Sequence, residues 1–286
     1  MKNQHLKNIL ELSFATLLIS TAAVLGKHIA MPASLIIWWR AILAFVFLYA
    51  FCKITGVKLK FYSTTDKITI FISALFLGAH WVTYFYSVKI SNVSIGMLSL
   101  YTFPAITSIL EPLITKTKFN KIHLLLAVLV FLGVYILAPE FNIENNDVQG
   151  IIWGLISAVL FTLRNILLKG RSQNYNGTMV MLYQLLVVSI VLLPTLFVFG
   201  ISEIKTQYPY IILLALFATA IGHSLFIKSL KHFSATTASI ILSTQPIFGI
   251  ILAYLFLGEI PSSNIYIGGS IILSTVVIES IRSKGK

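Results

Sequence analysis

Two histidines lie deep inside long apolar stretches of the sequence, where a lipid bilayer would surround them. His80 and His223 each occupy the central third of such a stretch, too far from either end for an imidazole to reach lipid headgroups. An ionisable residue at membrane depth is costly and marks a candidate functional site. Because imidazole titrates near neutral pH, the pair could hydrogen-bond a substrate or act as a protonation switch, and the alternative for each is a packing residue.

Aromatic and polar side chains at helical spacing accompany the two histidines. Trp81 and Tyr84 lie beside His80, and on another stretch Thr162 and Asn165 belong to one stripe. Aromatic walls suit organic, partly apolar substrates, although such residues in a helix bundle also serve packing alone. The predicted substrate-binding residues are His80, Trp81, Tyr84, Tyr101, Asn165, His223 and Gln245.

Three charged residues lie inside apolar stretches, and their depth separates their predicted roles. Arg40 lies about two helical turns from one end and is a candidate to bind a substrate carboxylate or to hold a gate by pairing across helices. Arg164 lies about one and a half turns from an end, so we expect it to reach the headgroups. Glu111 is a candidate proton carrier, but an ion pair with a nearby cation such as Lys116 is favoured.

Two prolines stand in the middle of apolar stretches at matched positions. Pro104 and Pro246 each remove a helical hydrogen bond and free a carbonyl, so we expect a kink at each. Such broken points bind ligands or act as hinges in transport proteins. We assign a gating or structural role to four residues, which are Arg40, Pro104, Glu111 and Pro246.

The composition requires a membrane to position these residues. Of 286 residues, 57% are hydrophobic and 10% are charged, far fewer charges than a soluble domain carries. The single cysteine, Cys52, excludes a disulfide framework and a multi-cysteine metal site. About 20 apolar residues span a bilayer as a helix. Ten such stretches are predicted, at 9–28, 34–52, 68–88, 93–115, 122–139, 149–168, 178–200, 209–230, 234–257 and 264–281.

The distribution of positive charge predicts the orientation. Sixteen of the 21 Lys and Arg residues fall at the two termini and in the loops on their side, and three fall in the opposite loops. Because cytoplasmic loops are rich in Lys and Arg, both termini are predicted to be cytoplasmic. The net charge of +12 therefore fixes topology and does not indicate a nucleic-acid partner. The apolar run near the N-terminus is interpreted as the first helix, not as a cleaved signal peptide.

The two halves of the sequence repeat each other. A shift of 142 positions places Thr102 on Thr244 and Pro104 on Pro246. Each half holds five stretches, an odd number, so the second half must enter the membrane from the opposite side. Inverted repeats of this kind occur in secondary transporters, where the substrate site lies near the midplane between the halves.

A family resemblance follows from these features together. The residues that carry it are Arg40, Pro104 and Pro246 in their helices, Gly258-Glu259 after the ninth helix, and the small residues Ala127 and Gly268-Gly269 of the fifth and tenth. The chain resembles the drug/metabolite transporter superfamily, specifically its EamA-like members. The resemblance implies two five-helix repeats, at 1–140 and 148–286, around a central cavity lined by helices 1–4 and 6–9. One departure is that Lys116-Thr117 stands where a second Gly-Glu would follow the fourth helix.

The sequence gives little support to other classes of protein. It has no H-E-x-x-H metal motif and no G-x-x-x-x-G-K-[ST] nucleotide loop, and Gly222-His223-Ser224 lacks the final glycine of a nucleophile elbow. No charged ring or filter suggests a channel. We therefore expect an all-α integral protein of the plasma (inner) membrane, not an enzyme, with no cofactor, metal or nucleic-acid partner. Its predicted function is alternating-access transport of amino acids, related metabolites or drugs, as an exporter by resemblance; an uptake carrier is the alternative. One chain is sufficient for a carrier, and the oligomeric state stays open.

Overall fold

The computed structural model describes residues 2–61, 63–116, 121–137, 142–168, 175–200, 204–225 and 244–282, and it contains no strand in these ranges. The elements are α1 (Lys2–His28), α2 (Ala33–Thr55), α3 (Thr64–Ile90), α4 (Val93–Leu100), α5 (Phe103–Thr115), α6 (Lys121–Leu137), α7 (Asn146–Leu168), α8 (Gly177–Val191), α9 (Pro194–Phe199), α10 (Ile204–Leu213), the π-helix η2 (Leu214–Gly222), α13 (Gln245–Leu257) and α14 (Ser263–Arg282).

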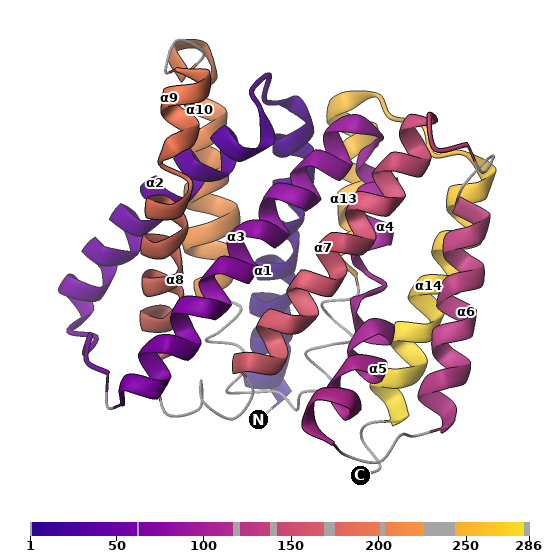
Figure 1. Cartoon of the computed structure of the whole chain (residues 1–286), viewed down its shortest axis with the longest axis horizontal. Coiled ribbons are helices and arrows are strands. Elements are labelled where there is room, and N and C mark those ends of the chain that lie inside the picture. The colour runs from indigo at the N-terminus through magenta and orange to yellow at the C-terminus, as the bar shows by residue number, and fades with distance from the viewer. Residues whose placement is uncertain are drawn as a thin grey trace.

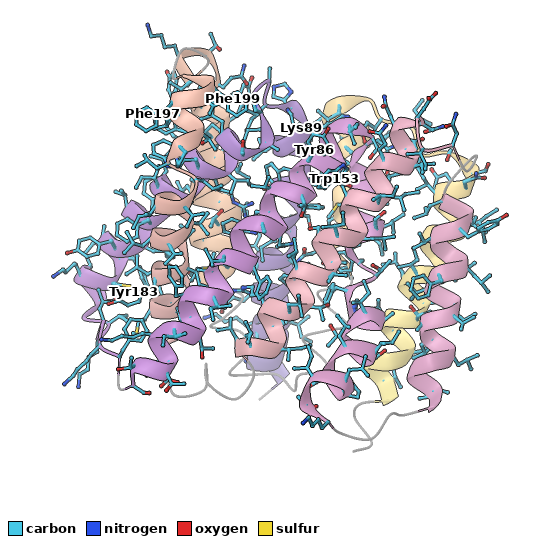
Figure 2. The ribbon with its side chains drawn as sticks, in the orientation of Figure 1. Tyr86, Lys89, Trp153, Tyr183, Phe197 and Phe199 are labelled. Atoms are coloured by element: carbon cyan, nitrogen blue, oxygen red, sulfur yellow. The ribbon has the colours of Figure 1, made fainter. Side chains whose placement is uncertain are left out.

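Length and hydropathy make this a membrane protein. Within the described ranges, six helical segments are long and apolar enough to cross a bilayer, at 7–28, 33–55, 64–90, 93–115, 146–168 and 204–225. Four shorter apolar helices lie at 125–137, 177–191, 245–257 and 263–278. Exposed aromatic residues such as Tyr86 and Trp153, whose rings meet edge to face at 5.1 Å, lie toward one end of the bundle (Figure 2), as in the aromatic belts of membrane proteins.

Two of the expected apolar stretches are broken by proline. The stretch expected at 93–115 divides into α4 and α5, and Pro104 lies in the first turn of α5. The stretch expected at 178–200 divides into α8 and α9, and Pro194 begins α9. Proline cannot donate to the preceding turn but fits the first turn of a new helix, which explains both positions. The second break had not been expected.

Helices from the first half of the sequence pack against helices from the second half. The most extensive interface joins α3 to α7, which run side by side near the centre of the view (Figure 1). In addition, α2 packs on α8 and η2, and α1 packs on η2 and α13. The elements before residue 142 and those after it therefore share one core.

The α6 and α14 helices lie side by side at one edge of the bundle (Figure 1). Their backbones approach closely at two glycines, because a Cβ on Gly268 would lie 2.6 Å from the carbonyl oxygen of Gly133. Small residues allow this approach between membrane helices. The start of α1 and the end of α14 lie on the same side of the bundle (Figure 1), opposite the end that carries Lys89 (Figure 2).

Candidate functional site

Arg40 is buried in the bundle and makes one hydrogen bond to the residues that the structure describes. Its side chain is 2% exposed, and Nε donates to Thr219 Oγ1 of η2 at 2.7 Å. The guanidinium carbon lies 4.1 Å from the ring centroid of Trp81 and 5.7 Å from that of Phe85, both on α3. Within the described part of the chain, Nη1 and Nη2 have no hydrogen-bond partner and no carboxylate forms a salt bridge with Arg40. The cation is therefore held by one neutral oxygen and two aromatic faces.

The acceptor for Arg40 lies in a π-helical segment. Thr219 Oγ1 donates to the carbonyl oxygen of Leu214, five residues earlier, at 3.1 Å. The hydroxyl hydrogen is used in that bond, so a lone pair of Thr219 faces the guanidinium. Segments of π-helix occur frequently at functional sites, but no periodicity in the sequence indicates one here.

His80 joins α3 to α7 through Ser157. Its Nδ1 lies 2.7 Å from Ser157 Oγ and 3.2 Å from the Ser157 carbonyl oxygen, and Ser157 Oγ donates to the His80 carbonyl at 2.9 Å. A carbonyl oxygen only accepts, so this network assigns the proton of neutral imidazole to Nδ1. The lone pair of Nε2, which has no hydrogen bond to a described residue, is then an acceptor. His80 is thus a packing residue with one nitrogen left for another partner.

Arg164 points toward a neighbouring helix, so the expectation that it reaches the headgroups is wrong for this conformation. Nη2 donates to Gln184 Oε1 of α8 at 2.8 Å, and Nη1 donates to Asn165 Oδ1 at 3.2 Å. Gln184 is fully buried, and its Nε2 donates to Ser73 Oγ of α3 at 2.8 Å. Depth alone suggested snorkelling, but the amide on α8 offers a nearer acceptor. Arg164 Nε is buried without a partner among the described residues.

The face of α7 that contacts His80 and Arg164 is offset by one residue from the stripe predicted from the sequence: it carries Phe161 instead of Thr162. The ring of Phe161 lies 4.8 Å from that of His80 and 5.9 Å from the guanidinium carbon of Arg164. Thr162, from the predicted stripe, instead contacts Thr107 Oγ1 of α5 at 3.0 Å. Consecutive helical residues point about 100° apart, so this offset changes which neighbour the stripe meets.

Two histidines and two arginines form a basic cluster in the described part of the bundle interior. His80 interacts electrostatically with Arg40, Arg164 and His223, and His223 interacts with both arginines. His223 is half-buried and directly follows η2. The structure therefore brings the two predicted histidines together and adds two arginines to them.

The predicted tyrosines belong to an aromatic chain through this site. The Tyr84 ring stacks near that of His80 at 6.2 Å, and Tyr101 meets Phe103 at 5.8 Å. Phe103 in turn packs on Phe161 at 5.0 Å. Both tyrosines are buried, so the wall of the site is aromatic along its length.

Four other predicted residues lie apart from these contacts. Gln245 and Pro246 are in the first turn of α13, Pro104 is in that of α5, and Glu111 is half-buried on α5. None of the four takes part in the contacts described above for the arginines and His80. Their proposed roles stay predictions.

At one end of the bundle, a hydrogen bond joins the two halves of the chain. Glu259 Oε2 accepts a hydrogen bond from the backbone N–H of Val93, the first residue of α4, at 2.9 Å. Gly258, with φ of 68°, ends α13 in the left-handed region that glycine favours, and so turns Glu259 away from the helix. Burial raises the pKa of the Glu259 carboxyl, and the Val93 N–H and Lys27 oppose this effect in part.

Two lysines add hydrogen bonds at the same end of the bundle. Lys27 Nζ donates to the carbonyl oxygens of Lys89, at 3.0 Å, and of Ser91. Lys89 Nζ donates to the carbonyl of Ile29 at 2.6 Å. The sequence suggested Lys27 and Lys89 only as loop charges. In the structure they donate hydrogen bonds to the backbone carbonyls at the ends of α1 and α3.

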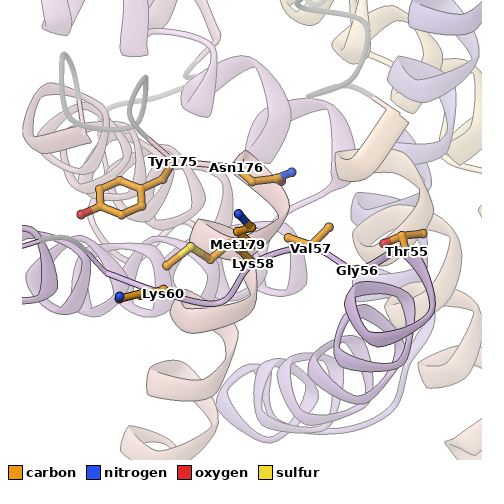
Figure 3. A pocket seen from close by; sticks show the side chains of 8 residues that line it. All are labelled: Thr55, Gly56, Val57, Lys58, Lys60, Tyr175, Asn176 and Met179. Atoms are coloured by element: carbon orange, nitrogen blue, oxygen red, sulfur yellow. The ribbon is translucent and has the colours of Figure 1, made fainter.

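The opposite end of the bundle carries a basic pocket of about 390 Å³ between the end of α2 and the start of α8 (Figure 3). It is lined by Thr55, Gly56, Val57, Lys58, Lys60, Tyr175, Asn176 and Met179. A second pocket, of about 440 Å³, includes Phe61, Lys67 and Tyr183. Neither contains a predicted substrate-binding residue, and no cluster of potential metal ligands occurs among the described residues.

Comparisons with known proteins agree with a membrane transport protein. The model of the EamA-like transporter family matches this chain twice, over 7–138 and 148–280. An uncharacterized transporter of Clostridium kluyveri is 25% identical over 225 residues, covering 76% of this chain and 70% of its own. One of Archaeoglobus fulgidus is 24% identical over 264 residues, covering 92% and 93%.

Two further similarities are more distant or more limited. A protein named S-adenosylmethionine uptake transporter, from Rickettsia felis, is 30% identical over 110 residues, which is 38% of this chain and 37% of that protein. One crystal structure of a protein with 16% identity covers 96% of both chains with a TM-score of 0.69, which shows a shared fold. With the family model matched over most of its length, this chain belongs to the EamA-like transporter family.

Proposed function

We propose that this protein is a secondary carrier that moves small organic molecules across the plasma membrane by alternating access. The observation that carries the proposal is the polar cluster at which α2 and α3 meet α7, α8 and η2. Hydrogen bonds from Arg40 to Thr219 and from His80 to Ser157 both join the first half of the chain to the second. A site shared by two halves is what rocking one half against the other would expose alternately.

The proposed topology is ten membrane helices in two inverted five-helix repeats, 1–140 and 148–286, with both termini cytoplasmic. The six long apolar segments and four shorter apolar helices support this number. The start of α1 and the end of α14 share one side of the bundle (Figure 1), as an even number of crossings requires. The excess of lysine and arginine on that side supports a cytoplasmic orientation.

The proposed substrate is an amino acid or a related metabolite, bound among His80, Trp81, Tyr84, Tyr101, Asn165, His223 and Gln245. The Nε2 lone pair of His80 can accept from an ammonium or hydroxyl group, and the aromatic rings can cover an apolar part. Export is the preferred direction. The uptake named for the Rickettsia felis relative supports uptake as the second candidate.

Transport by the purified full chain in lipid vesicles tests this function. Vesicles are exposed to, or loaded with, a mixture of amino acids, carboxylic acids, sugars and amines, with and without a pH gradient, and their contents are measured by mass spectrometry. We expect accumulation or release of at least one solute relative to protein-free vesicles. Movement of no solute under any of these conditions contradicts the carrier function.

The Glu259 contact is the proposed outer gate, and its burial gives it a pH dependence. A raised pKa means that this closed conformation binds a proton more tightly than an open one with a solvated carboxyl would. The closed end is therefore stabilised as the pH falls toward the raised pKa, and that stabilisation is lost as the pH rises through it. Lys27, which also interacts with Asp147 of α7, opposes this trend without reversing it.

Glu259→Gln is expected to hold the outer end closed at every pH, because the amide still accepts from Val93 and carries no charge to be solvated. A cysteine at Ser94, which is 2% exposed behind the gate, reports opening by its labelling with an impermeant maleimide in a Cys52→Ala background. In the chain that keeps Glu259, labelling should become slower as the pH falls. In the Glu259→Gln variant, labelling should be slow at every pH. A cysteine at the exposed Ala30 corrects for the pH dependence of the reagent. Equal pH profiles for both chains would exclude Glu259 as the gate.

A further inference from the structure

We propose that the substrate is an organic acid, whose carboxylate or other oxyanion supplies the counter-charge that Arg40 and Arg164 lack within the protein. This inference rests on the proposed carrier function and narrows its substrate class. It starts from two cations inside a membrane bundle. Among the described residues, each is hydrogen-bonded only by neutral oxygens: Thr219 for Arg40, and the amides of Gln184 and Asn165 for Arg164.

In the described part of the chain, no carboxylate lies against either arginine. Its acidic residues are Glu11, Asp66, Glu111, Glu140, Glu144, Asp147, Glu203, Glu259 and Glu279. None of those that the structure describes forms a salt bridge with Arg40 or Arg164. The sequence between η2 and α13, at 226–243, contains no Asp or Glu at all. The ionisable groups described near them are His80, His223 and Tyr84. A histidine cannot carry negative charge, and a tyrosine phenol is neutral at physiological pH.

Two unpaired guanidinium groups in this position are expensive. An isolated charge costs far more to bury than a polar group, and a purely structural buried arginine is normally paired. Here both cations would also repel a protonated His80 or His223 beside them. The cost is offset if the site binds an anion during the transport cycle, since the attraction is then gained in a medium of low dielectric constant.

Both arginines present nitrogen atoms for such a group. Arg40 has Nη1 and Nη2 without a partner in the described ranges, and its guanidinium carbon lies over the Trp81 ring, 4.1 Å from the centroid. A guanidinium fixed in this way matches a carboxylate with two parallel hydrogen bonds. Arg164 contributes a buried, unpartnered Nε. His80 interacts electrostatically with both arginines, and Phe161 packs on both its ring and Arg164.

The test compares acids with their uncharged analogues in the full-length protein. Vesicles are offered a defined mixture of succinate, malate, glutamate, phosphoenolpyruvate, glucose, uridine, putrescine and lysine methyl ester. Each transported acid is then made to compete with its amide or methyl ester. We expect the transported solutes to carry an acid group, and the acid to be preferred over its amide or ester by about 100-fold, because a site built for a polar group rejects the analogue that lacks it.

Variants separate charge recognition from a structural effect. Arg40→Gln should reduce the preference for acid over amide by at least about tenfold, whereas Lys53→Gln, which removes an exposed charge from the same helix, should leave it unchanged. Transport confined to glucose, uridine or the cations would overturn the organic-acid inference and leave the carrier function standing. An unchanged preference in Arg40→Gln would overturn it as well. Movement of no solute overturns the carrier function itself.

Discussion

Replacing Arg40 with methionine is expected to reduce transport by about 100-fold or more without lowering the thermal stability of the protein. The variant loses the hydrogen bond to Thr219 and the contact with Trp81, which together are worth about 1–3 kcal/mol. It also removes the cost of burying a cation that no described carboxylate neutralises, which is of similar or larger size. Methionine fills much of the same space, so no large cavity is left.

The combination of lost transport and retained stability distinguishes a binding residue from a structural one. Thermal unfolding in detergent and transport in vesicles are measured on the same preparations, with Lys53→Met as the matched control on α2. Arg40→Lys keeps the charge but not the two parallel donors, and so should fall between wild type and Arg40→Met in transport. If Arg40→Met unfolds many degrees earlier while its residual transport is near normal, Arg40 is a structural residue.

Hydropathy and charge predict much of this fold because they act on whole segments. A stretch of about 20 apolar residues must satisfy its backbone internally, so the membrane class and the positions of most helices follow from the sequence. The break at Pro194 is an exception, since proline is tolerated within many membrane helices and only packing decides whether the helix divides there. The orientation of the termini and the two-repeat organisation stay proposals.

The site is less accessible to sequence reasoning because it depends on helix rotation. Depth correctly selects His80 as a buried residue, but it does not say that Ser157 will be its partner. An apolar helix in a membrane lacks a polar face to mark its outer side, so a stripe can be misplaced by one residue, as with Thr162 and Phe161 on α7. A signal for the partner of Arg164 does exist, because Gln184 is a lone amide in an apolar stretch.

Gln184→Leu is expected to destabilise the protein strongly, by about 2–4 kcal/mol, because it leaves Nη2 of the buried Arg164 without its acceptor on α8. Gln184 is fully buried and links Arg164 of α7 to Ser73 of α3, so three helices lose a shared contact. Ser189→Ala, a buried substitution on the same helix whose hydroxyl bonds only the Leu185 carbonyl, should change stability by less than about 1 kcal/mol. Thermal unfolding in detergent compares the two.

The double variant Arg164→Met with Gln184→Leu shows what the arginine does. Removing the cation removes the cost of leaving it unpaired, so the double variant should recover most of the stability lost in Gln184→Leu, with a coupling of about 1–3 kcal/mol. Transport should not recover, because an organic acid loses one of its two counter-charges. If the double variant folds and still transports the acid, Arg164 has a structural role alone. If the double variant is no more stable than Gln184→Leu, the unpaired cation is not the cause of the instability. A stable, inactive double variant would mean that Arg164 serves substrate binding and that Gln184 supports Arg164 in that role.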